Sequence, residues 1–233
     1  MIQGLYTTTI IIGILMVAAF LIVRISRGGL PATFLKTGAS ICFILTAFST
    51  LLCNAENFKY GTPIIAGLIF GMLGDIWLDM KYVYEQHNHI YTYAGIICFI
   101  INHVFFITAI MTKYTEIKWW FIVINIIAAI IFSVISIALE KAMKLDYGRY
   151  KKIIFLYGAF LSCTMFTAIN GIVYNGFSKD FLIITIASVL FTLSDLVLSN
   201  IYFKEGGNTK LNIIVNHLLY YTAQFLFAST ILF

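Results

Sequence analysis

Three aspartates lie inside long apolar stretches of this chain: Asp75, Asp79 and Asp195. An ionisable side chain at membrane depth is costly, so it normally faces the protein interior and marks a functional site. Two carboxyl groups that meet in such an interior can share one proton. One of them can then donate a proton, while the other stabilises a positive charge or activates water. The sequence therefore predicts a catalytic carboxyl pair, Asp75 and Asp195.

Asp79 follows Asp75 by four residues, so the two side chains share one face of a helix. Asp79 also stands one turn from the expected end of that helix. We therefore favour a structural role for it, either as a cap or as the partner of a loop lysine such as Lys81. It is kept as a supporting site residue.

Other polar residues within apolar stretches could surround the pair. His103, Tyr221 and Gln224 are candidates for positioning water or a phosphate ester, although a lone intramembrane histidine is often only an interhelical hydrogen-bond donor. Further supporting candidates are Asn102, Ser199, His217 and Tyr220. A polar stripe at helical spacing predicts that one face of the helix around Asp195 borders a cavity or another helix; it comprises Thr185, Ser188, Thr192, Asp195 and Ser199.

The elements that must position these residues are apolar helices. Of the 233 residues, 61% are hydrophobic and 11% charged, which excludes a soluble globular enzyme. Each of eight apolar stretches reaches the roughly 20 residues that a bilayer requires. They cover residues 5–23, 33–53, 61–80, 91–112, 119–138, 153–174, 179–200 and 211–232. The sequence predicts an all-α integral membrane protein, an eight-helix bundle that forms one domain over residues 1–233.

Orientation follows from the 15 basic residues, most of which come after the first, third, fifth and seventh stretches. In this count Arg24, Arg27 and Lys36 belong to the first loop. Both termini are therefore expected on the non-cytoplasmic side. The net charge of +5 is explained by this rule and requires no nucleic-acid partner. Asp75 and Asp195 then lie at one depth, each ~8 Å from the cytoplasmic boundary.

Four segments carry a family resemblance: residues 67–78 with Gly74-Asp75, 95–106 with His103, 191–198 with Ser194-Asp195, and 220–224. Here the chain resembles the YhhN family of lysoplasmalogenase-like membrane proteins. The resemblance implies an eight-helix hydrolase that cleaves the vinyl ether bond of 1-alkenyl lysophospholipids. The products are a fatty aldehyde and glycerophosphoethanolamine or glycerophosphocholine. It also implies that the catalytic pair is Asp75 and Asp195. We expect a multi-pass protein of a bacterial cytoplasmic membrane.

The sequence departs from the family pattern at two positions. Asp79 stands where an apolar residue is expected, and Phe106 replaces a tyrosine that commonly follows the histidine by one turn. Both departures bear on the choice of substrate more than on the type of reaction.

Vinyl ether hydrolysis suits two carboxyl groups. An acid protonates the β-carbon, and a neighbouring anion stabilises the resulting oxocarbenium ion, as in glycosidases. Asp75, flanked by Gly74 and apolar residues, is our choice for the protonated acid, and Asp195 for the anion. This chemistry requires no metal and no cofactor; its partners are the lysophospholipid and the lipid bilayer.

Two other functions fit parts of this pattern. A proton-coupled membrane transporter of a lipid or small molecule would also use paired intramembrane aspartates. A zinc-dependent lipid amidase would need about three converging ligands, and only His103 and His217 are histidines at membrane depth.

Overall fold

The computed structural model describes residues 2–233, with side chains from residue 4 onward, and within this range it contains helices and no strands. The eight α-helices are α1 (Ile2–Ser26), α2 (Gly29–Cys53), α3 (Phe58–Met80), α4 (Asn88–Thr112), α5 (Trp119–Ala138), α6 (Lys151–Asn175), α7 (Lys179–Phe203) and α8 (Lys210–Ser229). Each one corresponds to one predicted apolar stretch. The all-α prediction is therefore confirmed, whereas the prediction that all eight helices span the membrane stays a prediction.

Long apolar helices are the expected form because they satisfy their own backbone hydrogen bonds where no water is present. The connections are short. Between α1 and α2 the chain reverses at Gly28 and Gly29, whose φ angles of 64° and 63° lie in the left-handed region. Glycine adopts this region without a Cβ clash, so the pair permits a very tight turn.

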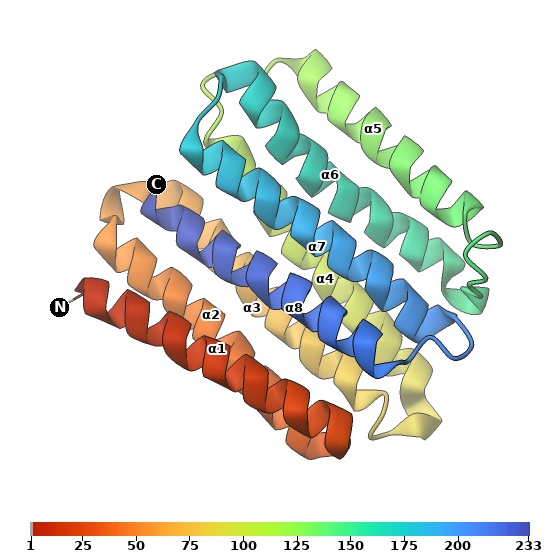
Figure 1. Cartoon of the computed structure of the whole chain (residues 1–233). Coiled ribbons are helices and arrows are strands. Elements are labelled where there is room, and N and C mark those ends of the chain that lie inside the picture. Colours follow the sequence, from red (N-terminus) through yellow and green to blue (C-terminus); the bar gives the residue numbers. More distant parts are fainter. Residues whose placement is uncertain (1) are drawn as a thin grey trace.

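The helices form one bundle of nearly antiparallel neighbours (Figure 1). Consecutive helices pack in pairs, and α8 lies centrally, in contact with α1, α2, α3 and α7. Helix α5 stands at one edge and packs on α6 (Figure 1). The two ends of the chain lie at the same end of the bundle (Figure 1).

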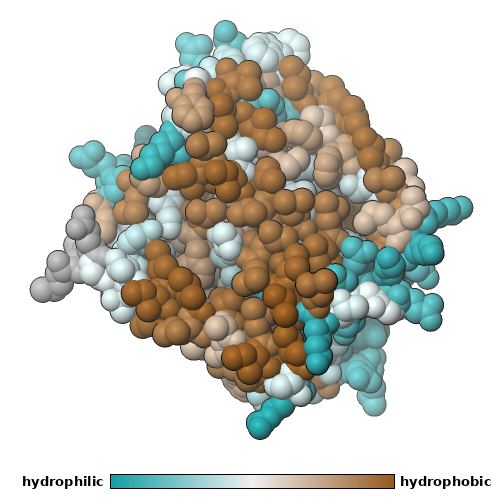
Figure 2. All heavy atoms as spheres, viewed as in Figure 1, coloured by the Kyte–Doolittle hydropathy of each residue, from teal (hydrophilic) through white to brown (hydrophobic). Residues whose placement is uncertain are grey.

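Seven helices, α1 to α7, are long and apolar enough to cross a membrane. The eighth helix, α8, carries polar side chains that are buried in the bundle, among them Asn216, His217 and Gln224. Figure 2 shows apolar side chains over the middle of the molecule and hydrophilic ones near the ends of the helices. Such an apolar surface is expected of a protein embedded in lipid.

One prediction about the helices is wrong. The sequence predicts Lys36 in the loop after the first span, but it lies within α2 and is only 5% exposed. It therefore cannot be counted as a loop charge that orients the protein. Its amine is instead an internal partner for the aspartates of α3.

Candidate active site

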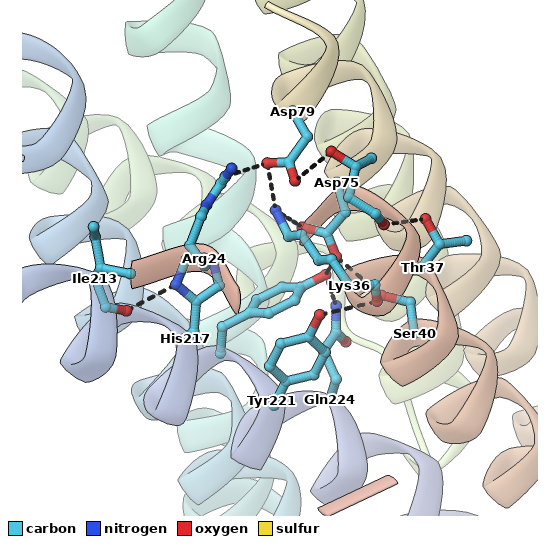
Figure 3. A network of polar contacts seen from close by, with 12 residues as sticks. Arg24, Lys36, Thr37, Ser40, Asp75, Asp79, Ile213, His217, Tyr221 and Gln224 are labelled. Atoms are coloured by element: carbon cyan, nitrogen blue, oxygen red, sulfur yellow. Dashed lines mark hydrogen bonds and ion pairs between the residues drawn. The ribbon is translucent and has the colours of Figure 1, made fainter. Parts of the chain in front are cut away.

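A buried network of charges joins α1, α2 and α3. Lys36 Nζ lies 3.0 Å from Asp75 Oδ1 and 3.4 Å from Asp79 Oδ1. The guanidinium of Arg24 donates to Asp79 Oδ1 at 2.5 Å. These four side chains point toward one another in Figure 3. Two cations and two carboxylates thus balance one another, which is what burial of charges requires.

Asp79 belongs to this network as its most enclosed member, with 0% of its surface exposed. Thr33 also donates to Asp79 Oδ2 at 3.2 Å. The structural role expected for Asp79 fits this arrangement, but the expected partner was wrong. The amine of Lys81 instead lies 2.9 Å from the centre of the Tyr202 ring.

Asp75 is held by three donors from two other helices. In addition to Lys36, Ser40 and Tyr220 donate to Asp75 Oδ2 at 3.2 and 2.8 Å. Ser40 follows Lys36 by four residues, so one face of α2 supplies both groups. The cation and the two hydroxyl donors all stabilise the anionic form of this carboxyl group.

Asp195 has a different environment. The hydroxyl of Tyr157 on α6 donates a hydrogen bond to Asp195 Oδ2. None of the five ion pairs among the residues that the structure describes includes Asp195. The two aspartates therefore differ in charge environment: Asp75 has a cation beside it, and Asp195 has a phenol.

Both aspartates line one cavity of about 210 Å³, which we call the carboxylate cavity. It reaches the end of the bundle where Gly28, Gly29, Tyr82 and Asn208 lie in or beside the connections between helices. This is the end that the basic loops predict to be cytoplasmic. The fold thus places two carboxyl groups that lie 120 positions apart in the chain along one cavity.

A second cavity, of about 100 Å³, adjoins the first, and we call it the apolar cavity. Asp195 borders both cavities, as do Leu78, Phe99, Leu198 and Tyr202. A Cβ on Gly74 would come within 2.7 Å of the Phe99 ring, so this glycine permits the ring to stand between the two cavities.

The supporting candidates divide into two groups. His217 and Tyr220 line the carboxylate cavity, and Ser199 lines the apolar cavity. Nδ1 of His217 lies 2.8 Å from the carbonyl oxygen of Ile213. Ser199 donates to the backbone carbonyl of Asp195 at 3.0 Å. Thr192, Asp195 and Ser199 of the predicted polar stripe do border a cavity.

The other candidates lie in the packed interior, outside the lining of both cavities as far as the structure describes them. Gln224 donates to the Tyr220 hydroxyl at 2.9 Å, and Tyr221 donates to the carbonyl of Lys36 at 3.1 Å. Asn102 donates to the Gly67 carbonyl at 2.7 Å, and Nδ1 of His103 lies 3.1 Å from the Thr164 hydroxyl. These side chains hold helices together around the site.

Arg24, from the last turn of α1, and Tyr82, from the segment after α3, line the mouth of the carboxylate cavity, and Lys81 precedes Tyr82 in that segment. The guanidinium carbon of Arg24 lies 5.2 Å from the centre of the Tyr82 ring. Burial lowers the pKa of Lys81 to about 7, against the attraction of Asp79. Burial likewise raises the pKa of Tyr82 to about 12.

Three residues near the aspartates escaped the sequence interpretation: Lys36, Arg24 and Tyr157. Lys36 is the fourth residue of the apolar stretch 33–53, and this position within a span was the signal that could have revealed a buried lysine. The count of basic residues places Arg24 in a loop, although it lies in the last turn of α1. Tyr157 is one of 14 tyrosines, and nothing in its local sequence sets it apart.

Among residues 2–233 the structure holds no group of three or more His, Cys, Asp or Glu side chains arranged to bind a metal ion. Comparisons of the sequence with curated proteins and with solved structures gave no match. A family model does match, and it covers residues 32–231, which include Asp75, Asp195, most of α2 and all of α3 to α8. The chain therefore belongs to the YhhN family.

Proposed function

We propose that this protein is a lysoplasmalogenase-like hydrolase of a bacterial cytoplasmic membrane. Its substrates would be 1-alkenyl lysophospholipids, and its products a fatty aldehyde and glycerophosphoethanolamine or glycerophosphocholine. The observation that carries the proposal is that Asp75 on α3 and Asp195 on α7 line one cavity. Membership of the YhhN family is consistent with it.

The reaction proceeds through protonation of the vinyl ether. The acid transfers its proton to the β-carbon, and the α-carbon becomes an oxocarbenium ion. Water then attacks the α-carbon and returns a proton to the carboxylate that the acid has become. The hemiacetal that forms breaks its bond to the glycerol oxygen, which takes the hydroxyl proton, and the aldehyde leaves. One water is consumed, and both carboxyl groups regain their initial state.

The environments of the two carboxyl groups favour Asp195 as the acid, which reverses the assignment expected from sequence. Lys36, 3.0 Å from Asp75, favours the anionic form of that side chain. Asp195 has no such partner among the described residues and borders an apolar space, conditions under which a carboxyl group retains its proton more readily. Asp75 then stabilises the oxocarbenium ion.

The polar end of the substrate fits the mouth of the carboxylate cavity. Arg24 lines this cavity and keeps 12% of its side chain exposed. A guanidinium group suits a phosphate ester because it offers several donors in one plane. With the mouth on the cytoplasmic side and both termini on the opposite side, the lysolipid would enter from the cytoplasmic leaflet.

The remaining candidates support this pair. Tyr220, which donates to Asp75, and Gln224, which donates to Tyr220, hold the anion in place. His217 borders the carboxylate cavity and would position the substrate or water. The proposed mechanism uses these side chains and no metal or cofactor.

The test is aldehyde release by the purified protein in detergent. We expect release from 1-alkenyl-lysophosphoethanolamine, none from its saturated 1-alkyl analogue, and no loss of activity with a chelator. Asp195→Asn should lower the rate at least about 100-fold, the usual contribution of a general acid. Leu193→Ala, at a 44% exposed position of the same helix α7, is the control for general disturbance.

Three results would count against the proposal. Release that survives Asp195→Asn would refute the assignment of the acid, and release abolished by a chelator would favour a metal hydrolase. Accumulation of intact lipid across proteoliposome membranes, without aldehyde, would favour the transporter.

A further inference from the structure

The apolar cavity has no role in the reaction described above, yet it meets the reacting carboxyl group directly. Asp195 borders it together with side chains from α4, α5, α6 and α7. Much of its lining is hydrocarbon, including Ile96, Phe132, Ile137, Ile154, Leu161 and Leu196. Among the lining residues that the structure describes, Asp195 is the one Asp, Glu, Lys, Arg or His.

The two cavities divide the surroundings of Asp195 by polarity. The carboxylate cavity has Arg24 and Lys36 in its lining, whereas the apolar cavity has neither. A wall that includes Phe99 and Tyr202 borders both. A molecule with its reacting bond at Asp195 would therefore have a polar part on one side of this wall and an apolar part on the other.

We infer that the apolar cavity is the binding site for the part of the substrate's hydrocarbon chain next to the vinyl ether. This inference rests on the proposed function for the identity of the lipid. Along α7 the lining runs from Thr192 to Phe203, a distance of about 16 Å at the rise of an α-helix. The cavity can thus accept the first segment of the chain, while the remainder extends beyond it.

Chain binding here supplies specificity as well as position. A carboxyl group can protonate the vinyl ether only if the double bond lies against it. Placing the first carbons between α5 and α6 fixes the β-carbon beside Asp195, whereas a lipid with a bulky or polar group at this point would be excluded.

The variants are chosen to fill the cavity without touching the carboxyl groups. Ser136 of α5 lines the apolar cavity, and among the described residues its hydroxyl donates to one group, the carbonyl oxygen of Phe132 one turn earlier. Ser136→Phe therefore adds a ring to the cavity and removes a hydrogen bond of minor importance. Val134 of the same helix is 51% exposed on the apolar surface, so Val134→Phe is the matched control. Ile154→Phe fills the cavity from α6 instead.

The experiment uses a lipid that the enzyme cannot cleave. The probe is a saturated 1-alkyl-lysophosphoethanolamine with a photoreactive diazirine within the first few carbons of its chain, mixed with the full-length protein in nanodiscs. After illumination, mass spectrometry locates the labelled residues. We expect labelling on the segments of α5 and α6 that line the cavity.

Ser136→Phe and Ile154→Phe should each lower this labelling at least about tenfold, because the added ring takes the space of the lipid chain in a packed cavity. Val134→Phe should leave the labelling unchanged. Thermal unfolding of each variant shows whether it is folded. Because Ser136→Phe and Ile154→Phe fill the cavity from different helices, a loss of labelling in both cannot be caused by a local distortion of one helix.

The inference is overturned if the label lies on other surfaces, such as the groove between α1 and α8 that includes Ile14 and Phe225, or if filling the cavity changes nothing. Failure of the proposed function gives a different result. In that case wild-type protein releases no aldehyde from the alkenyl lipid, whatever the labelling pattern. Aldehyde release with the label elsewhere overturns the chain site alone.

Discussion

Replacing Lys36 by methionine tests whether Asp75 is an anion. Lys36 is 5% exposed and its amine lies 3.0 Å from the carboxylate. At an effective dielectric constant of ~20, two unit charges at this distance attract by about 5.5 kcal/mol. Methionine retains the length of the side chain but removes the charge. Asp79 keeps Arg24 as its partner, whereas Asp75 keeps only its hydroxyl donors.

We expect Lys36→Met to lower the free energy of unfolding by about 3–5 kcal/mol, the usual cost of leaving a buried charge unpaired. For a protein of this size that corresponds to a fall in Tm of roughly 6–20 °C. The assay is thermal unfolding in detergent of wild type, Lys36→Met, Asp75→Asn and the double variant. Because the double variant removes both charges, it should be more stable than the sum of the single losses predicts, by about 2 kcal/mol or more.

The reasoning is refuted if the single effects simply add, within about 0.5 kcal/mol. An Asp75→Asn variant with an unchanged free energy of unfolding would be equally informative, because asparagine resembles a protonated aspartate. It would indicate that Asp75 carries the proton, as first expected from the sequence, and that Asp195 is the anion.

Three further changes test other parts of the site. Tyr157→Phe removes the donor that stabilises Asp195 as it gives up its proton and becomes an anion, so aldehyde release should slow about ten- to hundredfold, because a hydrogen bond to a charged group contributes about 1.5–3 kcal/mol. An unchanged rate would exclude Tyr157 from the mechanism. Gly74→Ala places a methyl group 2.7 Å from the Phe99 ring and should cost about 1–3 kcal/mol in thermal unfolding, whereas an unaltered Tm would show that the ring yields freely. Folding lowers the pKa of Lys81 from 10.5 to about 7, so between these pH values the folded protein binds fewer protons than the unfolded chain. Wild type should therefore gain stability relative to Lys81→Gln as the pH rises through this window. A constant difference in Tm between the two proteins from pH 6 to 10 would contradict this.

The sequence predicted the helices well because each is a long stretch of mostly apolar residues between short polar connections. The predicted boundaries of α3 and α4 differ from the observed ones by three residues at most, all at the first turns. The cost of a charge inside the membrane also singled out Asp75 and Asp195 as candidates, and both line the carboxylate cavity. Helical spacing showed which side chains share a face but not which helix each face meets.

That limit explains the errors near the site. Counting basic residues near span ends placed Lys36 in a loop, although the two carboxylates of α3 allow its amine to be buried within α2. For the same reason Lys81 was expected to pair with Asp79, while Arg24 reaches it from α1. The choice of Asp75 as the acid follows from its apolar neighbours in sequence and stays a prediction; the cation beside it in space is the reason why we propose Asp195 instead.

The most direct test of the two-carboxylate mechanism is hydrolysis of 1-alkenyl-lysophosphoethanolamine in heavy water, followed by mass spectrometry of the aldehyde. If Asp195 protonates the β-carbon, each aldehyde molecule formed by wild type carries one deuterium on the carbon next to the carbonyl, and Asp195→Asn yields almost none of this product. An aldehyde without deuterium, or the same labelled product at the same rate from Asp195→Asn, would contradict the mechanism.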